Sequence, residues 1–156
     1  MISETRDIIV KDVEIFYAKL DKAVTPFGNE ARWEVQIRTS DKSVADQWTK
    51  EYELNVKKQD DYWKVNLKRP LLNRNKEEND PPQIVDASRT PITGSNIGNG
   101  SKGNVKLFQY PYDVAGRKGT GSQLKAIQIT DLKIYEPDTS IDFEVLEEPT
   151  AKEASF

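Results

Sequence analysis

Two stretches of the chain alternate apolar and polar side chains, and this period of two constrains the fold more than any other feature. In residues 31–39 and 62–68 every second side chain is apolar: Trp33, Val35 and Ile37 in the first stretch, and Trp63, Val65 and Leu67 in the second. Successive side chains of a strand point to opposite faces. The pattern therefore predicts two half-buried strands with Trp33 in the core.

Three further segments favour strands, and one favours a helix. Residues 8–20, 106–112 and 124–135 are rich in β-branched and aromatic residues. In the last of them the alternation shifts near residues 128–131, which indicates either a bulge or a strand that serves two cores. Val44, Trp48 and Tyr52 recur every fourth position and predict a helix over residues 44–54, with Ser43 and Asp46 resembling a weak capping box and Trp48 in the core.

The rest of the body is predicted to be loop. Residues 70–104 are crowded with Pro, Gly and Asn and interrupted only by a short apolar IVDAS, so we expect a long excursion between strands. Five strands, one short helix and a long inter-strand loop favour a mainly-β protein, an OB-fold built on a five-stranded barrel.

Composition favours one folded domain with a tail. The chain has 156 residues, of which 31% are charged, with a mean hydropathy of −0.74, yet it carries three Trp, six Tyr and five Phe. We expect a domain over residues 1–136 and a disordered acidic tail over residues 137–156. No apolar run is long enough to span a bilayer and the start resembles no signal peptide, so we expect no membrane contact and a cytosolic protein.

Two residue types are missing, and their absence excludes whole classes of site. The chain has no Cys and no His. Disulfides, thiolate metal sites, Ser-His-Asp triads and HExxH zinc sites are therefore excluded. We expect no catalytic residue, no metal and no cofactor.

Charge is unevenly distributed along the chain. Residues 137–156 hold six acids against Lys152, a net charge of −5, and the remaining 22 bases and 20 acids give the body +2. Residues 101–128 hold five bases (Lys102, Lys106, Arg117, Lys118, Lys125) against Asp113. Acidic tails often compete for a basic surface of the same chain.

The segment around residues 106–112 carries the strongest functional signal. Lys106, Phe108, Tyr110 and Tyr112 stand at every second position, so one face of a strand presents a lysine and three rings. Tyr62, Lys64 and Lys68 give a second strand face of the same kind, which taken alone is slightly better explained as an ordinary solvated strand face. Rings stack on bases at about 1–3 kcal/mol each and lysines neutralise phosphates, so the pattern predicts a single-stranded nucleic-acid surface without sequence preference.

Other functions remain as alternatives. The aromatic strand is also suited to an oligomer interface in a structural or virion-assembly module. A Mg-dependent nuclease would need paired carboxylates, but the acids of the body (Asp60, Asp61, Glu77, Glu78, Asp80) stand in turn-like contexts that favour solvated loops. The glycines of GRKGTG lack the Lys and Ser/Thr of a P-loop and precede a strand, which argues against nucleotide hydrolysis.

Four segments carry a resemblance to a known family: KRPLL (Lys68 to Leu72), IVDASRTPI (Ile84 to Ile92), IGNGSKGNVKLFQYPYDVAGRKGTGSQLKAIQI (Ile97 to Ile129) and the acidic tail that ends in Phe156. In these segments the chain resembles the bacteriophage single-stranded DNA-binding proteins of T7-like and related phages. The resemblance covers residues 8–136 in general organisation, and the second half and the tail in particular.

The resemblance implies an OB-fold protein, not an enzyme, that coats single-stranded DNA during phage replication and recombination in the host-cell cytoplasm. It implies that the aromatic strand, together with Lys64, Lys68, Arg117 and Lys118, lines the DNA groove. It also implies that the tail covers the groove without DNA, contacts replication proteins such as a DNA polymerase or helicase, and supports a homodimer. The tail residues concerned are Asp142, Glu144, Glu147, Glu148, Glu153 and Phe156.

Overall fold

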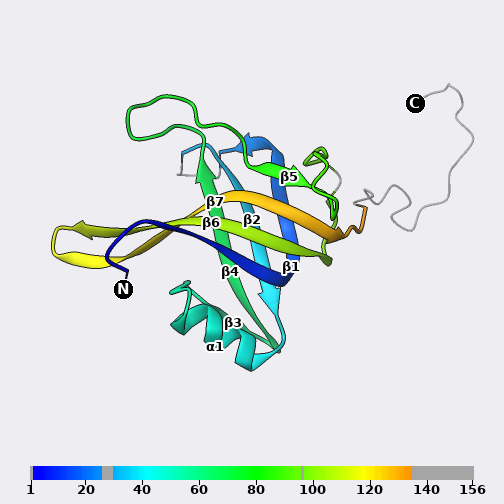
Figure 1. Ribbon diagram of the computed structural model, residues 1–156, viewed down its shortest axis with the longest axis horizontal. Coiled ribbons are helices and arrows are strands. Elements are labelled where there is room, and N and C mark those ends of the chain that lie inside the picture. The colour runs from blue at the N-terminus through cyan, green and yellow to red at the C-terminus, as the bar shows by residue number, and fades with distance from the viewer. Residues whose placement is uncertain (1, 26–29, 96, 135–156) are drawn as a thin grey trace, which may run out of the picture.

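The protein is a strongly bent β-sheet with one short helix at its end (Figure 1). The structure is a computed structural model that describes residues 2–25, 30–95 and 97–134. Its elements are β1 (Arg6–Val24), β2 (Arg32–Thr39), α1 (Lys42–Lys50), β3 (Lys57–Gln59), β4 (Tyr62–Pro70), β5 (Gln83–Val85), β6 (Ser101–Val114) and β7 (Arg117–Asp131). The prediction of a mainly-β protein with one short helix is confirmed.

The strands follow one another in the order β3-β4-β2-β1-β6-β7-β5. β1 belongs to both halves of this sheet, because its first part pairs with β6 and its second part pairs with β2. In Figure 1, β6 and β7 cross steeply over β2 and β4, with β1 turning from one direction to the other. The five predicted strands correspond to β1, β2, β4, β6 and β7.

Two bulges produce the bend in β1. Asp12 and Tyr17 have positive φ angles of 58° and 52°, and each coincides with a shift in the pairing of β1. Distant asparagines hold both bulges: the Asp12 N–H donates to Asn104 Oδ1 at 3.0 Å, and the Tyr17 N–H donates to Asn99 Oδ1 at 2.7 Å. Bulges bend a strand and increase its twist, so β1 can serve two crossing halves.

The core lies between the two halves. Trp33, Val35 and Ile37 on β2 are buried, as predicted, and Val65 and Leu67 face them from β4. Val105 and Leu107 of β6 are fully buried in the same cluster. Side chains of the opposite parity on each strand therefore point outward, on the outer surfaces of the two halves.

The helix covers one end of the core, with Trp48 only 1% exposed, as predicted. Its boundaries correct the prediction, because α1 begins at Lys42 and ends at Lys50, so that Tyr52 lies beyond it. The predicted capping box is wrong as well. Asp41 is the N-cap and accepts from the Ser43 N–H, and hydrogen bonds from the Ser43 side chain and backbone lower the pKa of Asp41. Among the described residues no helix has the length and hydrophobicity to cross a membrane.

The sheet remains open, although its two sides approach each other. β4 and β7 share no ladder within the described ranges, but the Arg69 side chain of β4 reaches across, Nη1 donating to the Leu124 carbonyl at 3.4 Å. The loop predicted over residues 70–104 contains β5, which pairs with β7 in parallel, and the short β3 was also not predicted. β3 and β5 were missed because each has three residues, which are too few for alternation of apolar and polar side chains to show in the sequence.

The pairing near the end of β7 agrees with the predicted bulge. The pairing of β6 with β7 shifts between Gly103↔Ile129 and Lys102↔Asp131, which leaves Thr130 as the extra residue. A second shift leaves Lys125 extra. The predicted tail at residues 137–156 lies outside the described residues.

Candidate nucleic-acid interface

The predicted aromatic strand is the outer face of β6. Lys106, Phe108, Tyr110 and Tyr112 alternate there with the buried Val105, Leu107 and Gln109, so the four predicted residues do share one face. The Phe108 and Tyr110 rings stack, with their centroids 5.9 Å apart. We call the outer surface formed by Lys106, Phe108, Tyr110, Tyr112, Arg117 and Lys125 the hairpin face, because the β6–β7 hairpin that carries it extends beyond the rest of the molecule in Figure 1.

Glycines in β7 support two of these rings. Tyr110 stands opposite Gly121 and Tyr112 opposite Gly119, and a Cβ at either glycine would collide with the ring. The rings therefore lie flat over the neighbouring strand, with 37% of Tyr110 and 41% of Tyr112 exposed. Part of each ring surface is used to cover the hairpin backbone.

The cations of the hairpin face have acidic neighbours. Lys125 Nζ donates to Asp7 Oδ2 at 3.0 Å, and Lys106 Nζ lies 4.0 Å from the same oxygen. The predicted site residue Lys118 stands opposite Asp113, which has the parity of the buried Gln109, so Lys118 lies on the other side of the hairpin and not on this face. The positive net charge of residues 101–128 therefore overestimates the charge of this face, because the Asp7 carboxylate of β1 also lies on it.

The remaining predicted residues lie on the other half of the sheet. Tyr62, Lys64 and Lys68 project from the outer face of β4, which pairs with β2 and has no ladder with β6. The resemblance implied that Lys64 and Lys68 line one groove together with the aromatic strand. The structure instead separates the predicted residues into two groups, one on each half.

A dense group of rings and cations surrounds Tyr62. We call it the β2–β4 face: Phe16, Tyr17, Lys19, Arg32, Arg38, Tyr62, Lys64 and Lys68. At its centre the Arg38 guanidinium carbon lies 3.8 Å from the centroid of Phe16 and 4.2 Å from that of Tyr62. Arg38 Nε also donates to Gln36 Oε1 at 2.6 Å. The same guanidinium carbon lies 5.4 Å from the centroid of Tyr17, so three rings from β1 and β4 surround one arginine of β2.

Tyr17 is the most exposed ring of the β2–β4 face, with 53% of its surface accessible. It occupies the second bulge of β1, and its φ of 52° is unusual for an aromatic residue. Its ring contacts Phe16 edge-on at 6.1 Å between centroids. Strained backbone of this kind is concentrated at ligand-binding sites.

A hollow of about 330 Å³ opens beside Tyr17, between the outer faces of β1, β2 and β4. Glu34 lies within it, and Arg32 Nε donates to Glu34 Oε1 at 2.9 Å. Lys19 and Lys68 stand directly opposite Glu34 on the two neighbouring strands. Three cations therefore surround one carboxylate.

Five side chains of the β2–β4 face were not predicted as site residues: Phe16, Tyr17, Lys19, Arg32 and Arg38. Alternation placed Arg32 and Arg38 on the polar side of their strand. It gave no sign that rings of β1 and β4 would lie beside them, because a period of two contains no information on which strands pair.

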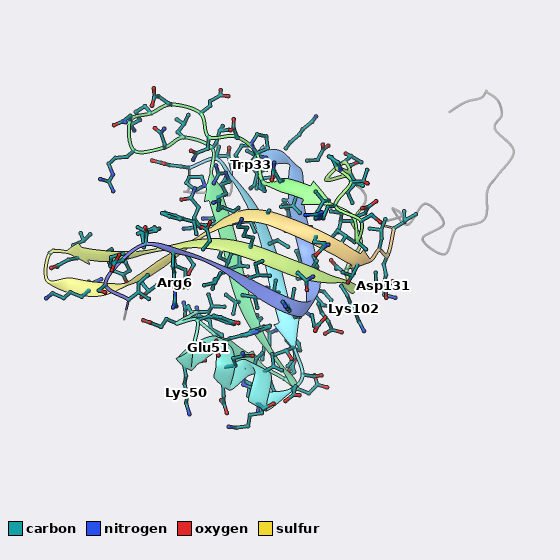
Figure 2. All side chains as sticks on the ribbon, in the orientation of Figure 1. Arg6, Trp33, Lys50, Glu51, Lys102 and Asp131 are labelled. Carbon is teal, nitrogen blue, oxygen red and sulfur yellow. The ribbon has the colours of Figure 1, made fainter. Side chains whose placement is uncertain are left out.

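One row of residues connects the two halves across β1. Lys64, Arg38, Glu14, Lys102 and Asp131 are successive partners on β4, β2, β1, β6 and β7. Figure 2 shows Lys102 and Asp131 together at one end of β6 and β7. The predicted site residue Lys102 thus lies between the β2–β4 face and the hairpin face.

Within the described ranges, no group of three acidic side chains is arranged to hold a metal ion. The tail residues that the sequence nominates, from Asp142 to Phe156, lie outside those ranges. The described interface offers rings, amides and cations, which are groups that bind by stacking and by charge.

The arrangement of strands in this chain is similar to that of several solved structures. The single-stranded DNA-binding protein from bacteriophage Enc34 aligns with a TM-score of 0.55 and 14% identity, over 88% of this chain and 90% of that chain. The same protein in complex with single-stranded DNA gives 0.55 and 14%, over 83% and 89%. The single-stranded DNA-binding protein gp2.5 of bacteriophage T7 gives 0.53 and 16%, over 92% and 100%. The chain has the fold of phage single-stranded DNA-binding proteins.

That fold is the one implied by the resemblance in residues 68–129. No protein-family model matches the chain, and no curated protein sequence matches it either. At identities of 14–16% the likeness concerns the arrangement of strands. The outer surfaces described above are therefore argued from this chain's own residues.

Proposed function

We propose that this protein binds single-stranded DNA without catalysing a reaction. The observation that carries the proposal is the β2–β4 face, where Arg38 lies over Phe16 and Tyr62 beside the strained Tyr17. Lys19, Arg32, Lys64 and Lys68 surround these rings. Rings supply stacking for unpaired bases, and the cations supply phosphate contacts. The fold similarity to phage single-stranded DNA-binding proteins supports the same proposal.

The position of this face in the fold agrees with the proposal. In OB-folds, oligonucleotides bind the outer face of the second and third barrel strands. Among the five long strands of this chain, β2 and β4 are the second and third. We propose that DNA lies on the β2–β4 face and continues across β1, past Lys102, to the hairpin face.

The role of the tail belongs to the same proposal. Residues 137–156 carry a net charge of −5, opposite in sign to the cations of the β2–β4 face. We propose that the tail competes with DNA for this face and, once displaced, contacts replication proteins such as a DNA polymerase or helicase, in the host-cell cytoplasm. Roles in replication and recombination, and a homodimer, are parts of this proposal.

A salt titration tests the proposal. Binding of a fluorescent oligo-dT should weaken steeply between about 50 and 200 mM salt, because phosphate contacts release counterions. A chain that lacks residues 137–156 should bind more tightly at every salt concentration, since the competitor is gone. Absent or salt-insensitive binding contradicts the DNA proposal, and unchanged binding by the shortened chain contradicts tail competition.

A further inference from the structure

The hollow on the β2–β4 face carries hydrogen-bonding groups that stacking and phosphate binding do not need. Val35 and Leu67, whose side chains are buried in the core, are also among the residues that line it. The side chains around it are Tyr17, Lys19, Arg32, Glu34, Gln36, Asn66 and Lys68. Sequence-independent binding requires only rings and cations, so the amides and the carboxylate call for another explanation.

The amides are oriented by a chain of hydrogen bonds. Arg38 Nε donates to Gln36 Oε1 at 2.6 Å, and Gln36 Nε2 donates to Asn66 Oδ1 at 2.9 Å. Each amide oxygen therefore accepts one hydrogen bond, which orients both amides. Asn66 Nδ2 has no acceptor among the described residues, and Asn66 is exposed. It presents a free donor at the hollow.

Glu34 supplies the complementary acceptor. Arg32 occupies its Oε1, while Oε2 has no hydrogen-bond donor within the described ranges. The Glu34 side chain is 29% exposed, so a ligand can reach it. A carboxylate repels phosphates, yet this one stands in the middle of the cations that would bind them. Its value to a nucleic-acid site is that it accepts hydrogen bonds from base amino groups.

We propose that the hollow holds one nucleobase of the bound strand and favours cytosine over thymine or uracil. The cytosine amino group donates to Glu34 Oε2, and Asn66 Nδ2 donates to an acceptor on the same pairing edge. Uracil and thymine place a carbonyl oxygen where cytosine has its amino group, and that oxygen faces the carboxylate unfavourably. Tyr17 stacks at the mouth of the hollow. This inference rests on the proposed DNA binding and adds a base preference to it.

The test compares oligo-dC with oligo-dU of about 12 nucleotides, within the range of site sizes of OB-folds. The two differ only in the groups on the pairing edge. Titrations of the full chain near pH 7.5 should give tighter binding of oligo-dC by about tenfold, the effect of a good base-edge contact. In Glu34→Gln the ratio should fall toward one, because the charged acceptor is lost.

A matched variant separates base reading from charge. Glu14→Gln removes a carboxylate from the neighbouring row, opposite Arg38 and Lys102, and Glu14 does not line the hollow. It should strengthen binding of both oligomers and leave their ratio unchanged. Equal binding of the two oligomers by the natural chain, tighter binding of oligo-dU, or an unchanged ratio in Glu34→Gln overturns the inference. Failure to bind either oligomer overturns the DNA proposal itself.

Discussion

Arg38 is the residue at which three strands of the outer surface meet. It contacts Phe16 of β1 and Tyr62 of β4 through its guanidinium group, and Gln36 of its own strand through Nε. Cation–π contacts of this kind contribute about 0.5–2 kcal/mol each. The same contacts orient both rings, so Arg38 positions the stacking surface as well as supplying charge to it.

Tyr17 provides a residue-scale prediction, because its backbone and its ring have separate effects. Tyr17→Gly should keep or raise the melting temperature, since glycine adopts a positive φ without strain. It should weaken oligo-dT binding by about tenfold, because a stacking ring is lost. Tyr17→Ala should lose the same binding and also melt at a lower temperature than Tyr17→Gly.

The control for Tyr17 is the other bulge of β1. Asp12 has a φ of 58° but carries no ring, so Asp12→Gly should raise stability and leave oligo-dT binding within about twofold. Equal binding by Tyr17→Gly and the natural chain would show that the ring takes no part.

At the scale of elements, a buried glutamine joins the hairpin to the helix. Gln109 of β6 is fully buried; it accepts from Arg6 Nε at 2.7 Å and donates to the Tyr52 carbonyl at 2.6 Å and to Ser122 Oγ at 2.9 Å. Arg6 also donates to the Glu51 carbonyl at the end of α1, and both residues are labelled in Figure 2. One side chain thus fixes β1, β7 and the segment after α1.

Gln109→Leu should therefore destabilise the protein by about 2–3 kcal/mol in urea unfolding, because Arg6 and the Tyr52 carbonyl lose their partner in the interior. Gln123→Leu is the matched control: Gln123 lies half-buried on the outer side of β7, opposite Phe108, and its loss should cost less than about 0.5 kcal/mol. Similar losses in the two variants would mean that the Gln109 network adds nothing to stability.

The elements also show what sequence could and could not predict. A period of two identified β2 and β4, and it placed Trp33 and Lys106 on the correct sides, because burial of one face imposes that period. The bulge at Tyr17 had no signal, since a positive φ usually falls on glycine. The approach of Asp7 to Lys125 depends on the pairing of β1 with β6 and of β6 with β7, and no local pattern encodes which strands pair.

At the scale of the whole molecule, the bend in β1 decides how the candidate site is arranged. It directs the β2–β4 face and the hairpin face outward from different halves of the sheet, so the predicted single groove becomes two surfaces. Lys102, next to Glu14 of β1, lies between them. A strand of DNA that used both surfaces would have to pass over β1.

Oligomer length distinguishes one continuous path from two independent sites. Tyr62→Ala should weaken binding of both a short oligo-dT of about 6 nucleotides and a long one of about 16, by roughly tenfold, because the β2–β4 face binds first. Phe108→Ala should weaken binding of the long oligomer alone, since only that oligomer reaches the hairpin face. If Phe108→Ala weakened both lengths equally, the hairpin face would be the primary site. If it weakened neither, the DNA path would end before the hairpin, leaving the Phe108–Tyr110 stack free to serve as an oligomer interface.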